Sequence, residues 1–130
     1  MLKSSIERLK ELTERLASFP SYDIITELST NLVFLAQDGI ILKVNRYAKN
    51  ILGYGPEEFI GKHWGDFIHP DDLAASLAAN PDKTEGKIFE VVNRMRSRDG
   101  TYRTISWRCT NWKHGQLYAI GKDRGTAHGK

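Results

Sequence analysis

A tight turn between two apolar segments constrains the fold of this chain more than any other sequence feature. Residues 32–36 and 40–44 are largely apolar, and Gln37-Asp38-Gly39 joins them. The Asp-Gly pair readily adopts the positive φ angles that a turn between antiparallel strands requires. The stretch therefore predicts a β-hairpin.

The central and C-terminal parts of the chain extend this pattern. Short helical segments, each closed by Gly or Pro, are expected at 46–52, 56–60 and 63–68, with a longer helix at 70–79. Three more strands, separated by turn sequences, are expected at 87–96, 101–110 and 116–122. This order predicts an α+β domain in which helices cover one face of a five-stranded antiparallel sheet.

The N-terminal segment, residues 4–19, predicts an amphipathic helix. Its apolar side chains fall at heptad positions: Leu2, Leu9, Leu12, Leu16 and Phe19. Ser4 or Ser5 is the expected N-cap, Pro20 ends the helix, and a shorter helix is expected at 23–29. Fewer than three heptads are present, so two interpretations remain open: a dimer seam, or a helix that lies on its own domain.

The composition fits a single soluble domain. The chain has 130 residues and a net charge of +3, and a chain of this length can bury about 65–70% of its unfolded surface without disulfides or metals. Its one cysteine, Cys109, fits a reducing compartment. No apolar run approaches the ~20 residues needed to cross a bilayer. We therefore expect a cytoplasmic protein.

Five segments, in this order, resemble the PAS domain family. They are DGIILKVN at 38–45, ILGY and PEEFIG within 51–61, HPDD at 69–72, RMRSRDG at 94–100, and IGKD at 120–123. Each segment is short, but five of them at these separations make a specific pattern. The resemblance covers about residues 31–123.

The resemblance implies a sheet in strand order 2-1-5-4-3 and a cavity under the helices that holds a small ligand or cofactor in many relatives. It also implies a sensory domain that controls an attached effector, such as a histidine kinase or a cyclic-dinucleotide enzyme. On this basis residues 1–29 form dimerisation helices, residues 30–124 form the PAS domain, and residues 125–130 form a flexible tail. The leading helix resembles those that mediate dimerisation in the family, which favours a homodimer.

Strand alternation indicates which side chains face the interior: in the strand at 87–96, Phe89, Val91, Asn93 and Met95 share the core face. The expected cavity lining comprises Ile41, Ile51, Phe59, Trp64, Phe67, Leu73, Leu77, Phe89, Val91, Asn93, Trp107 and Tyr118, with Ile120 and with Val33 and Leu35 or their neighbours. The alternative is a fully packed interior, which needs apolar residues at the same spacings. For Asn93 two roles remain open: a ligand contact, or an amide satisfied by backbone or water.

The residue types argue against the cofactors known in related domains. A photoactive flavin adduct needs a thiol in the helical insert, whereas Cys109 is on a late strand, and the helix at 71–80 offers no axial histidine to a haem. Four residues are spaced as in a metal cluster: His63, Asp66, His69 and Asp72. Acids at a helix start are explained by the helix dipole, so capping is favoured and no metal site is predicted.

The chain contains no recognisable catalytic motif, because it lacks a nucleophile with a histidine partner, a carboxylate pair and a glycine-rich phosphate loop. We therefore expect no enzymatic activity. The rival function is a nucleic-acid-binding sheet that uses Arg94, Arg96, Arg98 and Arg103. We favour the alternative that these arginines are the solvated outer face of the sheet, or that they pair with Glu7, Glu11 and Glu14.

Overall fold

The computed structural model describes residues 4–17, 22–80 and 83–126 of the chain. The elements are α1 (Ser5–Ala17), α2 (Tyr22–Leu28), β1 (Leu32–Gln37), β2 (Ile40–Val44), α3 (Tyr47–Leu52), α4 (Pro56–Phe59), the 3-10 helix η1 (Trp64–Phe67), α5 (Pro70–Ala78), β3 (Ile88–Arg96), β4 (Tyr102–Asn111), the 3-10 helix η2 (Lys113–Gly115) and β5 (Gln116–Thr126). This order confirms the α+β domain with an inserted group of helices.

The five strands form one antiparallel sheet in the order β2-β1-β5-β4-β3, as the resemblance implied. Asp38 and Gly39 have φ angles of 51° and 86°, which confirms the turn of the first hairpin. β5 is longer than expected, because its end pairs with the start of β4, where Thr126 lies opposite Arg103. Residues 125 and 126 are therefore part of the sheet, and the rest of the expected tail lies outside the described residues.

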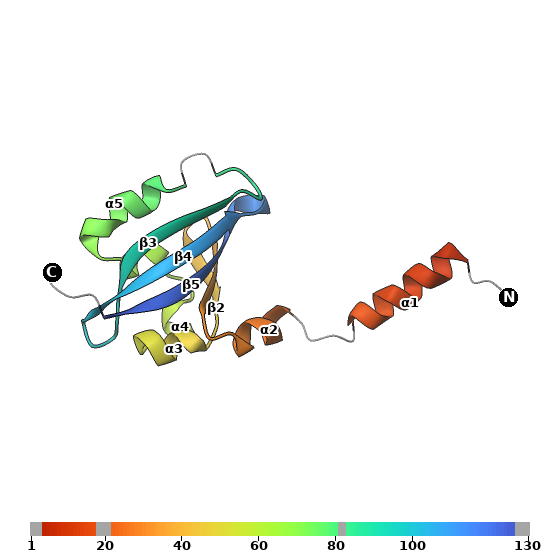
Figure 1. The fold of residues 1–130 in the computed structure, drawn as a ribbon, viewed down its shortest axis with the longest axis horizontal. Helices are drawn as coiled ribbons and strands as arrows, with labels where there is room; N and C mark the ends of the chain where they lie inside the picture. Colours follow the sequence, from red (N-terminus) through yellow and green to blue (C-terminus); the bar gives the residue numbers. More distant parts are fainter. Residues whose placement is uncertain (1–3, 18–21, 81–82, 127–130) are drawn as a thin grey trace.

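The helices divide between the two halves of the sheet (Figure 1). α3 packs against β1 and α4 against β2, while α5 packs against β3. The segment expected as a helix at 63–68 is shorter, because Ile68 leaves the 3-10 helix to pair with Met95 of β3. The largest side chains with almost no exposure form the centre of the core: Leu32, Ile41, Leu52, Phe59 and Ile105.

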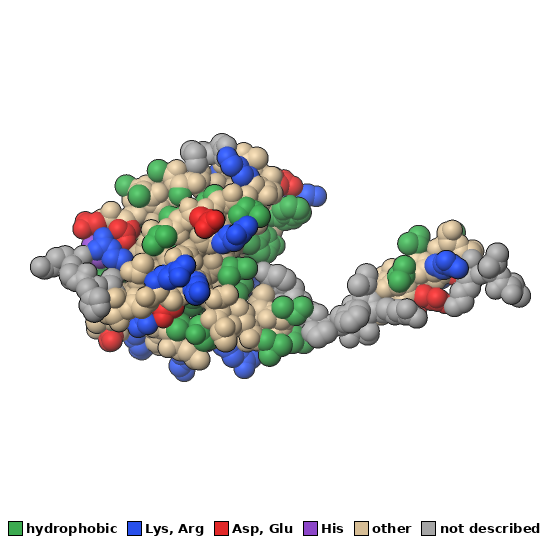
Figure 2. Space-filling view, viewed as in Figure 1, with side chains coloured by type: hydrophobic (Ala, Val, Ile, Leu, Met, Phe, Trp, Pro, Cys, Tyr) green, Lys and Arg blue, Asp and Glu red, His purple; other side chains and the backbone are tan. Residues whose placement is uncertain are grey.

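The leading helix α1 is capped as expected, since the backbone N–H of Glu7 donates to Ser4 Oγ at 3.2 Å. Leu9 and Leu12 are 63% and 53% exposed. Figures 1 and 2 show α1 apart from the sheet with hydrophobic side chains at its surface, so the helix does not cover its own domain. Of the other expected seam residues, Leu2 and Phe19 lie outside the described residues, and so does the side chain of Leu16.

The second helix, α2, is attached to the domain by polar contacts. Asn45 Nδ2 donates to the carbonyls of Thr26 and Asn31, both at 2.9 Å, and Asn45 Oδ1 accepts from the N–H of Val33 at 3.1 Å. Glu27 pairs with the guanidinium of Arg46 at 2.7 Å. In the described part of the chain, no helix has the length and hydrophobicity that a bilayer crossing requires.

Candidate functional site

A cavity of about 410 Å³ lies between the inner face of the sheet and α5. The sheet contributes side chains from every strand: Phe34 and Ala36, Ile41, Phe89, Val91, Asn93 and Met95, Trp107, Cys109 and Asn111, and Gln116, Leu117 and Ala119. Trp64, Ile68, Ser76, Leu77 and Asn80 line it from the helical side. Gly39, in the turn between β1 and β2, and Gly115, in the turn between β4 and β5, also border it. The interior therefore contains a space, in addition to a packed core.

Seven of the twelve residues expected to line a cavity do so: Ile41, Trp64, Leu77, Phe89, Val91, Asn93 and Trp107. Four of the remaining residues belong to the packed core or lie against it: Ile51, Phe59, Phe67 and Leu73. Tyr118 lies elsewhere, in a second hollow with Leu35, Lys43 and Trp112. Contact of any of them with a ligand stays a prediction.

The expected orientation of β5 is therefore reversed. Leu117 and Ala119 face the cavity, so the intervening Tyr118 faces the opposite side of the sheet, and the same phase turns Ile120 outward. Gly121 continues the inner face directly opposite Trp107. A Cβ at Gly121 would lie 2.6 Å from the indole ring, so only glycine leaves room for Trp107 in this position.

Asn93 makes side-chain hydrogen bonds that neither of the expected roles included. Its Oδ1 accepts from Trp107 Nε1 at 2.8 Å, and its Nδ2 donates to Ser76 Oγ at 3.1 Å. The two bonds join β3, β4 and α5 inside the cavity. Neither backbone nor water is needed to satisfy these two groups of the amide, because other side chains do so.

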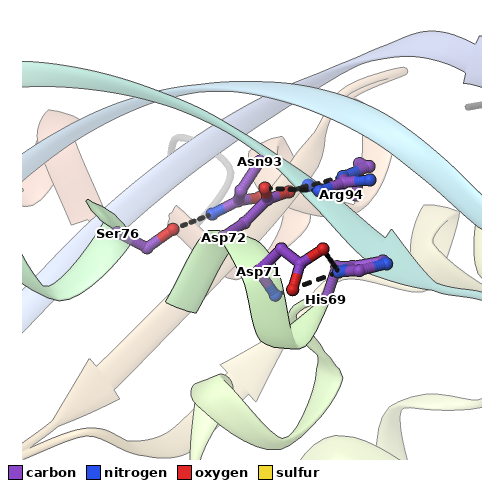
Figure 3. A network of polar contacts seen from close by, with 6 residues as sticks. All are labelled: His69, Asp71, Asp72, Ser76, Asn93 and Arg94. Atoms are coloured by element: carbon purple, nitrogen blue, oxygen red, sulfur yellow. Dashed lines mark hydrogen bonds and ion pairs between the residues drawn. The ribbon is translucent and has the colours of Figure 1, made fainter. Parts of the chain in front are cut away.

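A second polar contact lies one residue along β3, at the free edge of the sheet, where the backbone of Arg94 also takes part. The guanidinium of Arg94 donates to both carboxylate oxygens of Asp72, at 2.9 and 2.8 Å, and the backbone N–H of Arg94 donates at 2.8 Å. Figure 3 shows Asp72 and Ser76 of α5 turned toward Arg94 and Asn93 of β3. The hydrogen bonds from Arg94 hold the pKa of Asp72 below its ordinary value.

A third polar contact joins the end of α5 to β4. Asn80 and Asn111 exchange two amide hydrogen bonds, at 2.9 and 2.7 Å. Asp72 and Ser76 are four residues apart and share one face of α5, and Asn80 follows two residues after the helix ends. We call these three residues and their partners the polar seam of α5; its residues are Asp72, Ser76, Asn80, Asn93, Arg94 and Asn111. Of these six residues, the sequence predicts only Asn93 as a cavity contact.

The histidines near this region cap helices, as the interpretation we favoured requires. His63 Nδ1 accepts from the N–H of Gly65 at 2.9 Å, and His69 Nδ1 accepts from the N–H of Asp71 at 3.1 Å. Within the described residues, no three His, Cys, Asp or Glu side chains are grouped so that they could hold a metal ion. Burial raises the pKa of the Cys109 thiol to about 12, which keeps it protonated at neutral pH.

The four arginines of the nucleic-acid alternative have acidic or phenolic partners within the domain. Arg94 binds Asp72, Arg96 Nε donates to the hydroxyl of Tyr54 at 3.4 Å, and Arg98 pairs with Glu58. Arg103 binds Asp123 at 2.7 Å. The sequence favours an interpretation in which these arginines lie on the solvated outer face of the sheet or pair with the acids of α1. Their partners come instead from α4, α5, β5 and the segment before α4. The arrangement gives the nucleic-acid alternative no support.

Comparison with known proteins agrees with this architecture. The family model described as PAS fold matches residues 41–121. The aryl hydrocarbon receptor nuclear translocator homolog of Drosophila melanogaster is 35% identical over 87 residues, which cover 65% of this chain and 12% of that protein. The chain therefore spans a small part of this relative's length.

Two solved structures show the same fold. A domain of the sensory box sensor histidine kinase/response regulator from Geobacter sulfurreducens has a TM-score of 0.66 and 23% identity, over 87% of this chain and 96% of that one. The PAS-B domain of Drosophila melanogaster Cycle, solved with bound ethylene glycol, has a TM-score of 0.61 and 20% identity, over 72% and 98%.

Proposed function

The chain belongs to the PAS fold family, and from that premise we propose that its cavity binds a small ligand whose presence controls an effector protein. PAS domains are sensory modules of signal transduction, and the domain itself is not catalytic. The observation that supports a ligand is the cavity of about 410 Å³ under α5. Its size falls in the range of about 300–1,000 Å³ that is usual for small-molecule sites.

The polar seam of α5 supports a route from the ligand to the protein surface. A molecule in the cavity lies against Ser76 and Asn93, and the same helix and strand carry Asp72 and Arg94 to the outside. Binding shifts the position of α5 to the extent that the ligand favours one arrangement of these contacts over another. We propose a histidine kinase or a cyclic-dinucleotide enzyme as the effector. The fold shared with a domain of the Geobacter sulfurreducens sensor histidine kinase/response regulator supports the first.

The ligand proposal is tested by native mass spectrometry of freshly purified protein and by thermal unfolding with a panel of neutral one-ring molecules. We expect either a retained mass or a rise in melting temperature, because a ligand that binds only the folded state stabilises it. Ala119→Leu places three extra carbons in the cavity and is expected to abolish the rise. No retained mass and no rise with any molecule would rule out the ligand proposal.

We also propose that the domain forms a homodimer through α1. Ile6, Leu9 and Leu12 are all more than half exposed, and α1 stands apart from the sheet (Figure 1). Exposed apolar side chains along one short helix favour association with a second apolar surface. A second copy of α1 supplies such a surface with matching heptad spacing.

Light scattering tests the dimer with the double variant Leu9→Glu, Leu12→Glu. We expect the wild type to have the mass of two chains and the variant the mass of one. The PAS core should keep its native fold in the variant, because α1 stands apart from the sheet and both side chains are exposed in the single chain. Lys10→Glu is the matched control, since it adds the same charge at an exposed position outside the heptad pattern. A double variant that keeps the mass of two chains would refute the proposed dimer contact through α1.

A further inference from the structure

The buried polar groups of the cavity are concentrated on one side of it. Ser76 of α5 is 7% exposed, Asn93 of β3 is 4% exposed, and Asn111 of β4 is also buried. The strands at the other edge of the sheet contribute Phe34 and Ala36 from β1 and Ile41 from β2. A molecule that fills the cavity therefore meets polar groups on the side of α5 and β3 and an apolar wall on the side of β1 and β2.

The orientation of the Asn93 amide is determined by its neighbour. An indole N–H can only donate, so the oxygen of the amide must face Trp107 Nε1, and the amide nitrogen must then face Ser76. Ser76 Oγ accepts this hydrogen bond, which leaves its own hydroxyl hydrogen to donate. Among the contacts of the described residues, neither that hydrogen nor the second amide hydrogen of Asn93 has an acceptor. The polar side of the cavity thus presents two hydrogen-bond donors.

The two charged side chains that border the cavity, Asp38 and Lys83, are exposed at its rim. The imidazole of His63 is partly exposed. The inner lining described here consists of apolar side chains, a thiol, a serine, a glutamine and three asparagines. An ionised ligand would lose its hydration in this interior without gaining an opposite charge, which is strongly unfavourable. The lining therefore favours a neutral molecule.

We propose that the cavity selects a neutral molecule that carries an apolar ring and a carbonyl or ether oxygen, and that Ser76 and Asn93 donate hydrogen bonds to this oxygen. The proposal rests on the ligand-binding function proposed above and adds the chemical class of the ligand. The oxygen lies between α5 and β3, and the ring lies against Phe34 and Ile41. Such a ligand completes the hydrogen bonding of both donors, so it ties α5 to β3 more firmly than an apolar molecule of the same shape.

Three probes of similar shape separate the contributions: acetophenone, ethylbenzene and benzoate. Acetophenone has the ring and the oxygen, ethylbenzene has only the ring, and benzoate adds a charge. The full chain is titrated with each probe while the tryptophan indole N–H signals are followed by NMR, because Trp64, Trp107 and Trp112 all border the cavity. We expect acetophenone to bind about tenfold more tightly than ethylbenzene, and benzoate to cause no shift.

Variants of Ser76 assign the preference to its hydroxyl group. Ser76→Ala is expected to reduce the preference for acetophenone over ethylbenzene without abolishing it, because Asn93 still donates. Ser76→Thr keeps the hydroxyl and the full preference. Ser106→Ala is the matched control, since this serine lies on the other face of β4, where it accepts from Arg124. Should Ser76→Ala fail to fold, the comparison of the wild type with Ser76→Thr still tests the proposal.

The outcomes separate this proposal from the ligand-binding function itself. Equal binding of acetophenone and ethylbenzene by the wild type would overturn the proposed selectivity and leave ligand binding intact. An unchanged preference in Ser76→Ala would overturn the role of Ser76. Tighter binding of benzoate would overturn the preference for a neutral ligand. A lack of any shift with all three probes would overturn both the selectivity and the binding of one-ring molecules.

Discussion

The helices on the two sides of the cavity are held to the sheet in different ways. On the side of β1 and β2, α4 inserts Phe59, whose ring lies 5.2 Å from that of Phe34, 5.3 Å from that of Tyr54 and 4.7 Å from that of Phe67. On the side of β3, the one buried residue of α5 is Ser76. α4 is thus attached by an aromatic cluster, and α5 by the polar seam together with the partly buried side chain of Leu73.

The two kinds of attachment have different energetic consequences. Burial of aromatic side chains contributes several kcal/mol and belongs to the cooperative core of the domain. A hydrogen bond within a protein contributes only about 1 kcal/mol net, because it replaces bonds to water. We therefore expect α5 to detach from the sheet at a lower free energy than α4, and to be the side of the cavity that opens.

Removal of an aromatic ring from the cluster should have the largest effect on stability. Phe59→Ala leaves a cavity at a fully buried position and should lower the free energy of unfolding by about 3–5 kcal/mol, as measured by urea titration. Ile60→Ala, at the adjacent and partly exposed position, is the control and should cost less than about 1 kcal/mol. Similar losses for the two variants would contradict the central role of the aromatic cluster.

Removal of the buried amide from the polar seam should have an intermediate and more local effect. Asn93→Leu leaves the indole N–H of Trp107 without its acceptor, which costs about 1–3 kcal/mol. Hydrogen exchange should accelerate in α5 more than in α4. Adding Trp107→Phe removes the orphaned donor, so it should recover part of the lost stability unless the cavity left by the smaller ring outweighs this gain. Equal acceleration in both helices would mean that α5 is not the weaker attachment.

The sequence predicts the inner faces of β3 and β4 well because the alternation of their side chains is unambiguous. In β3, charged residues separate Phe89, Val91 and Asn93 over part of the strand, so only one face suits the core. β5 offers Leu117 and Ala119 on one face and Tyr118 and Ile120 on the other, and both faces are apolar. Size alone predicts that Tyr118 and Ile120 face the core. The inner face, however, has to accommodate Trp107, which requires Gly121 opposite the indole.

The polar seam could not be predicted from the helix alone. Polar residues four apart, such as Asp72, Ser76 and Asn80, are also the normal pattern of a helix face that lies in water. What distinguishes them is the presence of Arg94, Asn93 and Asn111 on strands that are 17 to 31 residues away along the chain. Pairing between such distant residues depends on the register of the sheet, which short-range patterns do not specify.

The outer end of the polar seam should have the smallest effect, and it should depend on pH. The pKa of Asp72 is lowered in the folded state by the hydrogen bonds from Arg94, so the carboxylate stabilises the fold above its unfolded pKa of about 3.9. This stabilisation is lost as the pH falls through the lower, folded pKa. Hydrogen exchange in α5, corrected for the intrinsic effect of pH, should therefore accelerate on acidification below about pH 4.

Asp72→Asn should remove most of this acid dependence in α5 and should already weaken its attachment at pH 7. Asp71→Asn is the matched control, because Asp71 is the neighbouring acid and its side chain is well exposed. Asp123, whose pKa Arg103 also lowers, lies in β5, so its protonation should affect the exchange of β4 and β5 rather than that of α5.

If Asp71→Asn and Asp72→Asn changed the pH profile of α5 equally, the effect would come from the charge at the helix start and not from the pair with Arg94. The outer part of the polar seam would then not attach α5 to the sheet, and the contrast between the two helices would depend on Ser76 and Asn80 alone.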